Sequence, residues 1–139
     1  TCLITKMQKP PEWINADYAR VDASEDIILS FTPDPESEIR TYSLERKTGF
    51  DGSFTQIYNF TNSIGGVLFA DHDADISKVN FYRLKALNNC NNPITISNTA
   101  SNMVLSVEKD EENISLSWNK YRDWNGINDS YRLFVKTGQ

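Results

Sequence analysis

The sequence repeats one phrase, and the spacing between its two copies limits what the chain can fold into. Residues 27–31 (IILSF) correspond to residues 114–118 (ISLSW), and Tyr42 and Tyr131 follow the two copies. The aromatic residues that end the copies lie 87 positions apart, and the two tyrosines lie 89 positions apart. A repeat of this length matches one small β-sandwich. We therefore expect a chain that is organised in modules.

Short segments rich in β-branched and aromatic residues alternate with polar turns along the chain, which is typical of strands. We predict a first set of strands at residues 13–21, 27–31, 39–46, 54–60, 67–70, 79–87 and 94–97. A second set follows at residues 104–107, 114–118 and 131–135. This spacing of short strands and turns favours an all-β, seven-stranded sandwich.

The repeat divides the chain into three parts. We predict the last strand of a preceding module at residues 1–9, one complete module at 10–102, and the first strands of a following, incomplete module at 103–139. An incomplete sandwich leaves apolar surface uncovered. We therefore expect that the chain is an excerpt of a longer protein, or that another chain completes this part.

Composition excludes several classes of function. The 139 residues carry a formal net charge of −5, whereas a nucleic-acid partner requires clustered lysine and arginine. No apolar run reaches the roughly 20 residues of a membrane span. His72 is the only histidine, which leaves no histidine cluster for zinc and no partner set for a catalytic triad. We expect no enzyme, no cofactor, no nucleic-acid partner and no membrane span.

Several motifs resemble those of a known family. Phe31 and Trp118 at the ends of the repeated phrase, residues 42–44 (YSL) and residues 82–86 (YRLKA) are similar to motifs of fibronectin type III domains. This resemblance implies a fibronectin type III or immunoglobulin-like β-sandwich. Phe31 stands where that family usually has tryptophan, which keeps an aromatic residue in the core.

Further motifs resemble a narrower group, the tandem modules of large surface proteins from Bacteroidetes. They are residues 10–12 (PPE), 42–46 (YSLER), 69–71 (FAD), 87–92 (LNNCNN) and 116–124 (LSWNKYRDW). Such proteins often end in a gliding-motility-associated C-terminal domain and resemble cargo of type IX secretion. The resemblance implies an extracellular or cell-surface location in a bacterium.

The two cysteines occupy positions one repeat length apart. Cys90 follows the sixth predicted strand, and Cys2 lies 88 residues earlier. Equivalent positions in neighbouring modules are much farther apart than the roughly 4.4–6.8 Å between Cα atoms that a disulfide needs. We therefore predict that the two cysteines are not bonded to each other within one chain. We also expect that residues 3–7 of one copy could pair with the open edge of residues 104–139 of another copy, a strand exchange.

One acidic turn has the spacing of a calcium loop. Asp71, Asp73 and Asp75 lie at alternate positions, as the first ligands of such loops do. The usual glycine at the sixth position is Ile76, and the usual glutamate at the twelfth is Tyr82. A turn that joins two strands is therefore the expected role, with weak calcium binding as the alternative.

The three tryptophans have different expected roles. We expect Trp118 in the core because of its place in the repeat. Trp13 follows Pro10 and Pro11, and we expect it at the junction with the preceding module. Trp124 lies in a loop, where it packs against the neighbouring module or stacks on a sugar ring or a partner protein.

These features favour a non-catalytic module of a cell-surface or secreted protein, acting as a spacer or adhesion scaffold in a tandem array. The expected partners are neighbouring modules and a protein or glycan ligand. The alternative is an accessory, carbohydrate-binding module of a secreted polysaccharide-degrading enzyme.

Overall fold

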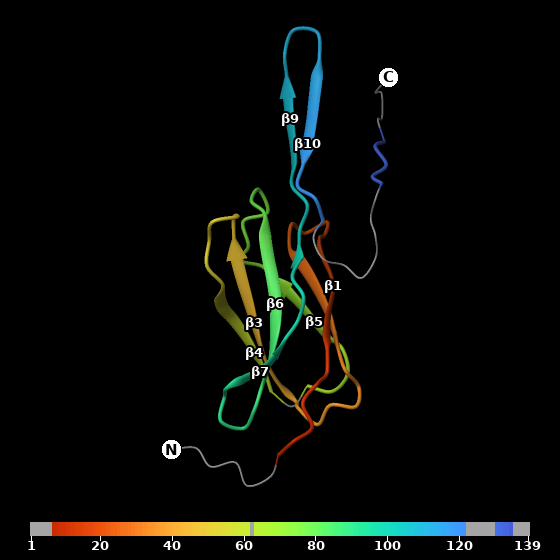
Figure 1. Ribbon diagram of the computed structural model, residues 1–139. Coiled ribbons are helices and arrows are strands. Elements are labelled where there is room, and N and C mark those ends of the chain that lie inside the picture. The colour runs from red at the N-terminus through yellow and green to blue at the C-terminus, as the bar shows by residue number, and fades with distance from the viewer. Residues whose placement is uncertain (1–6, 62, 122–129, 135–139) are drawn as a thin grey trace.

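The computed structural model describes residues 7–61, 63–121 and 130–134, and all of the elements in these residues are strands (Figure 1). The described residues form no helix, and so they contain no helix that could cross a membrane. The strands are β1 (Ile14–Val21), β2 (Ile27–Pro33), β3 (Thr41–Thr48), β4 (Thr55–Phe60), β5 (Val67–Asp71), β6 (Asn80–Leu87), β7 (Pro93–Ile96), β8 (Ala100–Ser101), β9 (Leu105–Lys109) and β10 (Ile114–Trp118).

Two antiparallel sheets form a sandwich. One sheet has the order β1-β2-β5, and the other has the order β4-β3-β6-β7, with β8 also paired to β6. Strands β9 and β10 form a separate two-stranded sheet that projects from one end of the sandwich (Figure 1). This arrangement confirms the predicted all-β sandwich. The division at residues 10 and 102 stays a prediction, and residues 3–6 of the proposed strand exchange lie outside the described residues.

The core lies between the two sheets and follows the alternation of each strand. In β2, Ile27, Leu29 and Phe31 are fully buried, whereas the residues between them are partly exposed. The facing sheet buries residues of β3 and β6, namely Tyr42, Leu44, Tyr82, Leu84 and Ala86. Because alternate side chains of a strand point to opposite faces, the sequence predicts one shared face for the β3 pair of this list and one shared face for its three β6 residues. The structure confirms both predictions.

The strand register sets which loops share an end of the sandwich. Residue 14 of β1 pairs with residue 33 of β2, and residue 41 of β3 pairs with residue 87 of β6. The β2–β3, β4–β5 and β6–β7 connections therefore lie at one end, which we call the entry end. The β1–β2 and β5–β6 connections lie at the opposite, exit end, from which β9 and β10 project (Figure 1).

Two expectations about the second copy of the repeat are wrong. Residues 130–134 form no strand, although a strand was expected at 131–135. Trp118 is 37% exposed, and its ring contacts Tyr131 edge to face with the centroids 5.5 Å apart. The physical reason is that β9 and β10 pair only with each other in the described residues, so no second sheet covers the Trp118 side chain.

The prediction that the two cysteines are not bonded to each other within one chain is also wrong. Cys90, in the turn between β6 and β7, is disulfide-bonded, and the only other cysteine of the sequence, at position 2, lies outside the described residues. Met7 and Gln8 line a hollow together with Asn88 and Asn89 of the same turn. The start of the described chain thus lies beside the Cys90 turn of this sandwich, not one module length away.

Candidate functional site

An exposed aromatic residue lies beside a hollow at the entry end. Trp13 directly precedes β1, is 47% exposed, and lines a hollow of about 410 Å³. The β2–β3 connection contributes Arg40 to the lining, and the β4–β5 connection contributes Ile64. The structure therefore places Trp13 at the end of the sandwich where a preceding segment enters, and it gives this residue a free ring surface.

Asp34 fixes the loops around Trp13. Its carboxylate accepts hydrogen bonds from the backbone N–H groups of Glu12 at 3.0 Å and Glu36 at 2.9 Å. These two bonds hold the pKa of Asp34 below its ordinary value. The Asp34 N–H donates to the carbonyl oxygen of Trp13 at 3.0 Å. The tryptophan is thus presented by a loop that is hydrogen-bonded on both sides.

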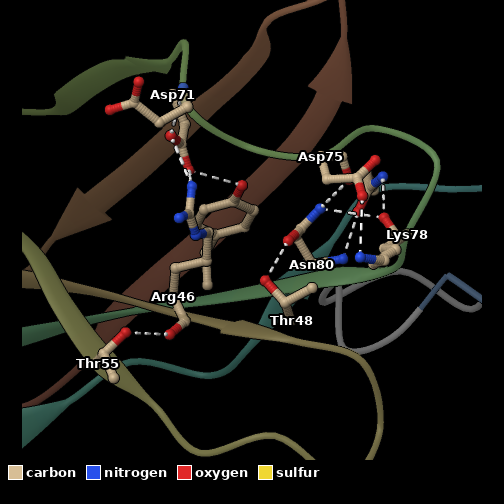
Figure 2. Close-up of polar contacts among 10 residues, drawn as sticks. Arg46, Thr48, Thr55, Asp71, Asp75, Lys78 and Asn80 are labelled. Atoms are coloured by element: carbon tan, nitrogen blue, oxygen red, sulfur yellow. Dashed lines mark hydrogen bonds and ion pairs between the residues drawn. The ribbon is translucent and has the colours of Figure 1, made fainter.

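The acidic turn that begins at Asp71 forms hydrogen bonds with other side chains of the protein itself. Asp71 is buried at the end of β5, and both of its carboxylate oxygens accept hydrogen bonds from Arg46, at 3.0 and 2.8 Å (Figure 2). The hydroxyl group of Tyr82 donates to the same carboxylate at 2.9 Å. Burial, and then the neighbouring Asp71 charge, raise the pKa of Tyr82, so its hydroxyl stays protonated and donates.

Asp75 has other partners. It accepts hydrogen bonds from the Ser77 hydroxyl and backbone N–H, and it forms an ion pair with Lys78 at 3.1 Å. The hydrogen bond from Ser77 is the main reason why the pKa of Asp75 is lowered. No three metal-binding side chains gather anywhere in the described part of the chain. The structure therefore does not bring Asp71, Asp73 and Asp75 together, and calcium binding stays a prediction.

The exit end contains a junction that sequence reasoning missed. The side chain of Asn119, just after β10, accepts a hydrogen bond from the Val104 N–H at 2.7 Å and donates to the Asn102 carbonyl at 2.9 Å. The buried Asn102 side chain in turn accepts from the Asn80 N–H at 2.7 Å. Asn80 is held by Thr48 and by the turn at residues 75–78 (Figure 2).

A second contact joins the same segment to the other sheet. The buried N–H group of Ala19 in β1 donates to the Tyr121 hydroxyl at 3.0 Å. Burial raises the pKa of Tyr121. The sequence offered no signal for this contact because Tyr121 and Ala19 are 102 residues apart. Trp124, the other candidate at this junction, lies outside the described residues.

The comparisons with known proteins concern the fold. No family model and no curated protein sequence matches this chain. A solved fibronectin type III-like protein from Clostridium thermocellum is similar, with 18% identity over 73% of this chain and 100% of that chain and a TM-score of 0.52. The twitchin kinase region from C. elegans aligns with 17% identity over 76% of this chain and 18% of that chain, with a TM-score of 0.47. Strand pairing, core and the Clostridium likeness together show that the chain has a fibronectin type III-like β-sandwich fold.

Proposed function

We propose that this chain is a non-catalytic segment of a secreted or cell-surface multi-module protein, in which it acts as a spacer or adhesion scaffold. The observation that carries this proposal is the hydrogen-bonded junction at the exit end. Asn119 binds Asn102, which in turn binds Asn80 of β6, and Tyr121 binds Ala19 of β1, so the β9–β10 segment is connected to both sheets of the sandwich. A junction of this kind limits bending between neighbouring parts, whereas a flexible linker would not. Neighbouring modules are then the first partners of the sandwich.

Two observations support an extracellular location. Cys90 is disulfide-bonded, and disulfides persist mainly in oxidising compartments outside the cytosol. The sequence motifs also resemble the tandem modules of Bacteroidetes surface proteins. We propose that the chain belongs to a bacterial protein of that kind, exported to the cell surface or the medium.

Backbone ¹⁵N relaxation of the whole chain tests the spacer role. We expect β9–β10 amides to report the same overall tumbling as the sandwich. Asn119→Ala removes two hydrogen bonds of the junction, so it should release the β9–β10 segment. Ser115→Ala, an exposed truncation in the same part of the chain, should leave the tumbling unchanged. Independent tumbling of β9–β10 in the unaltered chain would contradict the proposal.

A carbohydrate-binding accessory role is the second candidate, and the exposed Trp13 ring beside a hollow favours it. Aromatic side chains with one free surface can stack on sugar rings. A glycan array tests this role with the unaltered chain and with the Trp13→Ala and Trp124→Ala variants. Binding that either substitution abolishes would support it, and an array without bound glycans would exclude it.

A further inference from the structure

Strand β5 forms an edge of the sandwich that lacks the usual bulge, proline or exposed charge. It is the last strand of the sheet β1-β2-β5, and among the described residues it pairs with β2 alone. Half of the N–H and C=O groups of an edge strand point away from its neighbour, where another strand can bind them. Soluble proteins commonly block such edges with bulges, prolines or charged side chains. An edge without these devices is available to a partner strand.

The other three edges of the sandwich each carry a blocking device. In β1, the N–H and C=O groups of Ala16 bind the side chain of Asn98, at 2.6 and 3.4 Å. In β4, the register with β3 shifts and leaves Ile57 as an extra residue, which makes a bulge. Strand β7 begins with Pro93, which has no N–H group. By contrast, β5 pairs with β2 in unbroken register from residue 67 to residue 71.

This side of the molecule also lacks charge. The chain has 24% charged residues and a net charge of −5, yet residues 52–70, which include β4 and nearly all of β5, contain no charged residue. The one acidic residue of β5, Asp71, is buried and paired with Arg46. Two copies of an acidic chain repel each other, and they do so least where neither surface carries charge. A charged partner finds no counter-charge here, so the edge suits a second copy of the chain.

We propose that β5 pairs antiparallel with β5 of a second copy of this chain. A two-fold axis brings the same patch of both copies together, so one self-complementary strand is sufficient. The two three-stranded sheets then form one sheet with the order β1-β2-β5-β5-β2-β1. Pairing centred on Phe69 places Leu68 opposite Ala70 of the second copy. This contact does not rest on the proposed spacer role.

The side chains of β5 supply apolar contacts on both faces of the new sheet. On the outer face, Leu68 is 69% exposed. Phe69 points to the inner side, where its ring lies 5.0 Å from that of Tyr58 and 5.9 Å from that of Phe60, measured between centroids. Tyr58 is itself 48% exposed. Pairing centred on Phe69 brings the ring clusters of the two copies toward the axis, and aromatic cross-strand pairs stabilise sheets.

Sedimentation equilibrium from about 10 μM to about 1 mM tests the proposal. The paired strand has five residues, so the interface is small and we expect a dissociation constant on the order of 100 μM. Leu68→Glu places like charges of two copies near each other and should weaken dimerisation at least about tenfold. Leu105→Glu, at a position of β9 that is 57% exposed, makes the same change in net charge and should leave dimerisation unchanged. Added salt screens the repulsion between the copies, so the dimer should not weaken.

Cross-linking tests the register and decides the question if Leu68→Glu fails to fold. Chains with Leu68→Cys, mixed with chains with Ala70→Cys, should form a disulfide-linked dimer, because opposite Cβ atoms lie about 4.5–5.5 Å apart. Leu68→Cys alone should cross-link less, because its two copies lie diagonally, about 7–8 Å apart.

Three results would overturn the proposal. A chain that stays monomeric at about 1 mM leaves the edge to a strand of a different protein. A dimer that Leu105→Glu weakens as much as Leu68→Glu does, or that weakens in salt, uses another surface. Cross-linking that is equally efficient for Leu68→Cys alone and for the mixture excludes the register centred on Phe69.

Discussion

Tyr82→Phe is the sharpest test of how the buried polar groups stabilise this fold. The substitution removes one hydroxyl group and keeps the ring in the core, where Tyr82 is fully buried. Asp71 then loses the hydrogen bond at 2.9 Å but keeps both bonds from Arg46 and one from the Asp73 N–H. A hydrogen bond to a charged group contributes about 1.5–3 kcal/mol. Because Asp71 keeps other donors, we expect the free energy of unfolding to fall by about 1.5 kcal/mol, near the low end of this range.

Arg46→Met should lower the free energy of unfolding further, because it removes the positive charge that pairs with the buried Asp71 carboxylate. Breaking such a pair from one side costs about 3–5 kcal/mol when both partners are buried. The Arg46 side chain is 22% exposed, so water reaches the site and we expect about 3 kcal/mol. Both substitutions act on Asp71, and the double variant should depart from additivity by at least about 0.5 kcal/mol.

Urea unfolding measures both variants. With a slope of about 1.5 kcal/mol per molar urea, the midpoint should fall by about 1 M for Tyr82→Phe and about 2 M for Arg46→Met. The slope itself should not change. A loss below about 0.5 kcal/mol for Tyr82→Phe, or strict additivity in the double variant, would refute the view that the three groups act as one unit.

Three further predictions concern the ends of the sandwich. Tyr121→Phe removes the acceptor of the buried Ala19 N–H, so hydrogen exchange of that amide should accelerate about fivefold, as expected for about 1 kcal/mol. Asp26 accepts a hydrogen bond from His72 and raises its pKa above 6.5. The stabilisation of the fold by this ion pair is therefore complete below about pH 6.5 and is lost above the raised pKa of His72. The urea midpoints of the unaltered chain and of His72→Gln should differ at pH 5.5 and agree at high pH. A thiol assay on the denatured, unreduced monomer should detect no free thiol at Cys90.

Alternation along a strand was the dependable signal in this sequence. It predicted that Tyr42 and Leu44 share one face, because side chains of a strand alternate between two faces, whatever the strand pairs with. The structure buries both residues in the core. The same rule pointed Glu45 outward, and the register agrees. It could not show that Glu45 is 8% exposed, because that burial comes from Arg83 and Lys85 on the neighbouring strand. Contacts across strands depend on register, which a single sequence does not state.

The repeat predicts which positions of two modules are equivalent, but it does not predict how far apart those positions lie. Its period related Cys90 to the other cysteine as matching positions of two modules, and the disulfide shows that this relation was wrong. The same period assigned Trp118 to a core, but burial requires a covering sheet, and none covers it in the described residues. For Trp13 the neighbouring prolines were informative, because proline cannot continue a strand ladder. The first strand was predicted to begin at Trp13, whereas β1 begins one residue later, at Ile14.

In the proposed array, the hydrogen bonds of the exit-end junction would hold neighbouring parts of the protein in one fixed orientation. Apolar contacts are non-directional, so they leave two packed parts free to slide. Hydrogen bonds need narrow ranges of distance and angle. Asn119 binds two backbone groups at once, and Tyr121 binds a third on the other sheet. Asn102 in turn binds Asn80 of β6, so one line of hydrogen bonds leads to each sheet. Two such attachments fix an orientation, whereas one would leave a hinge. Repeated along an array, the same orientation would add length module by module, which is what a spacer requires.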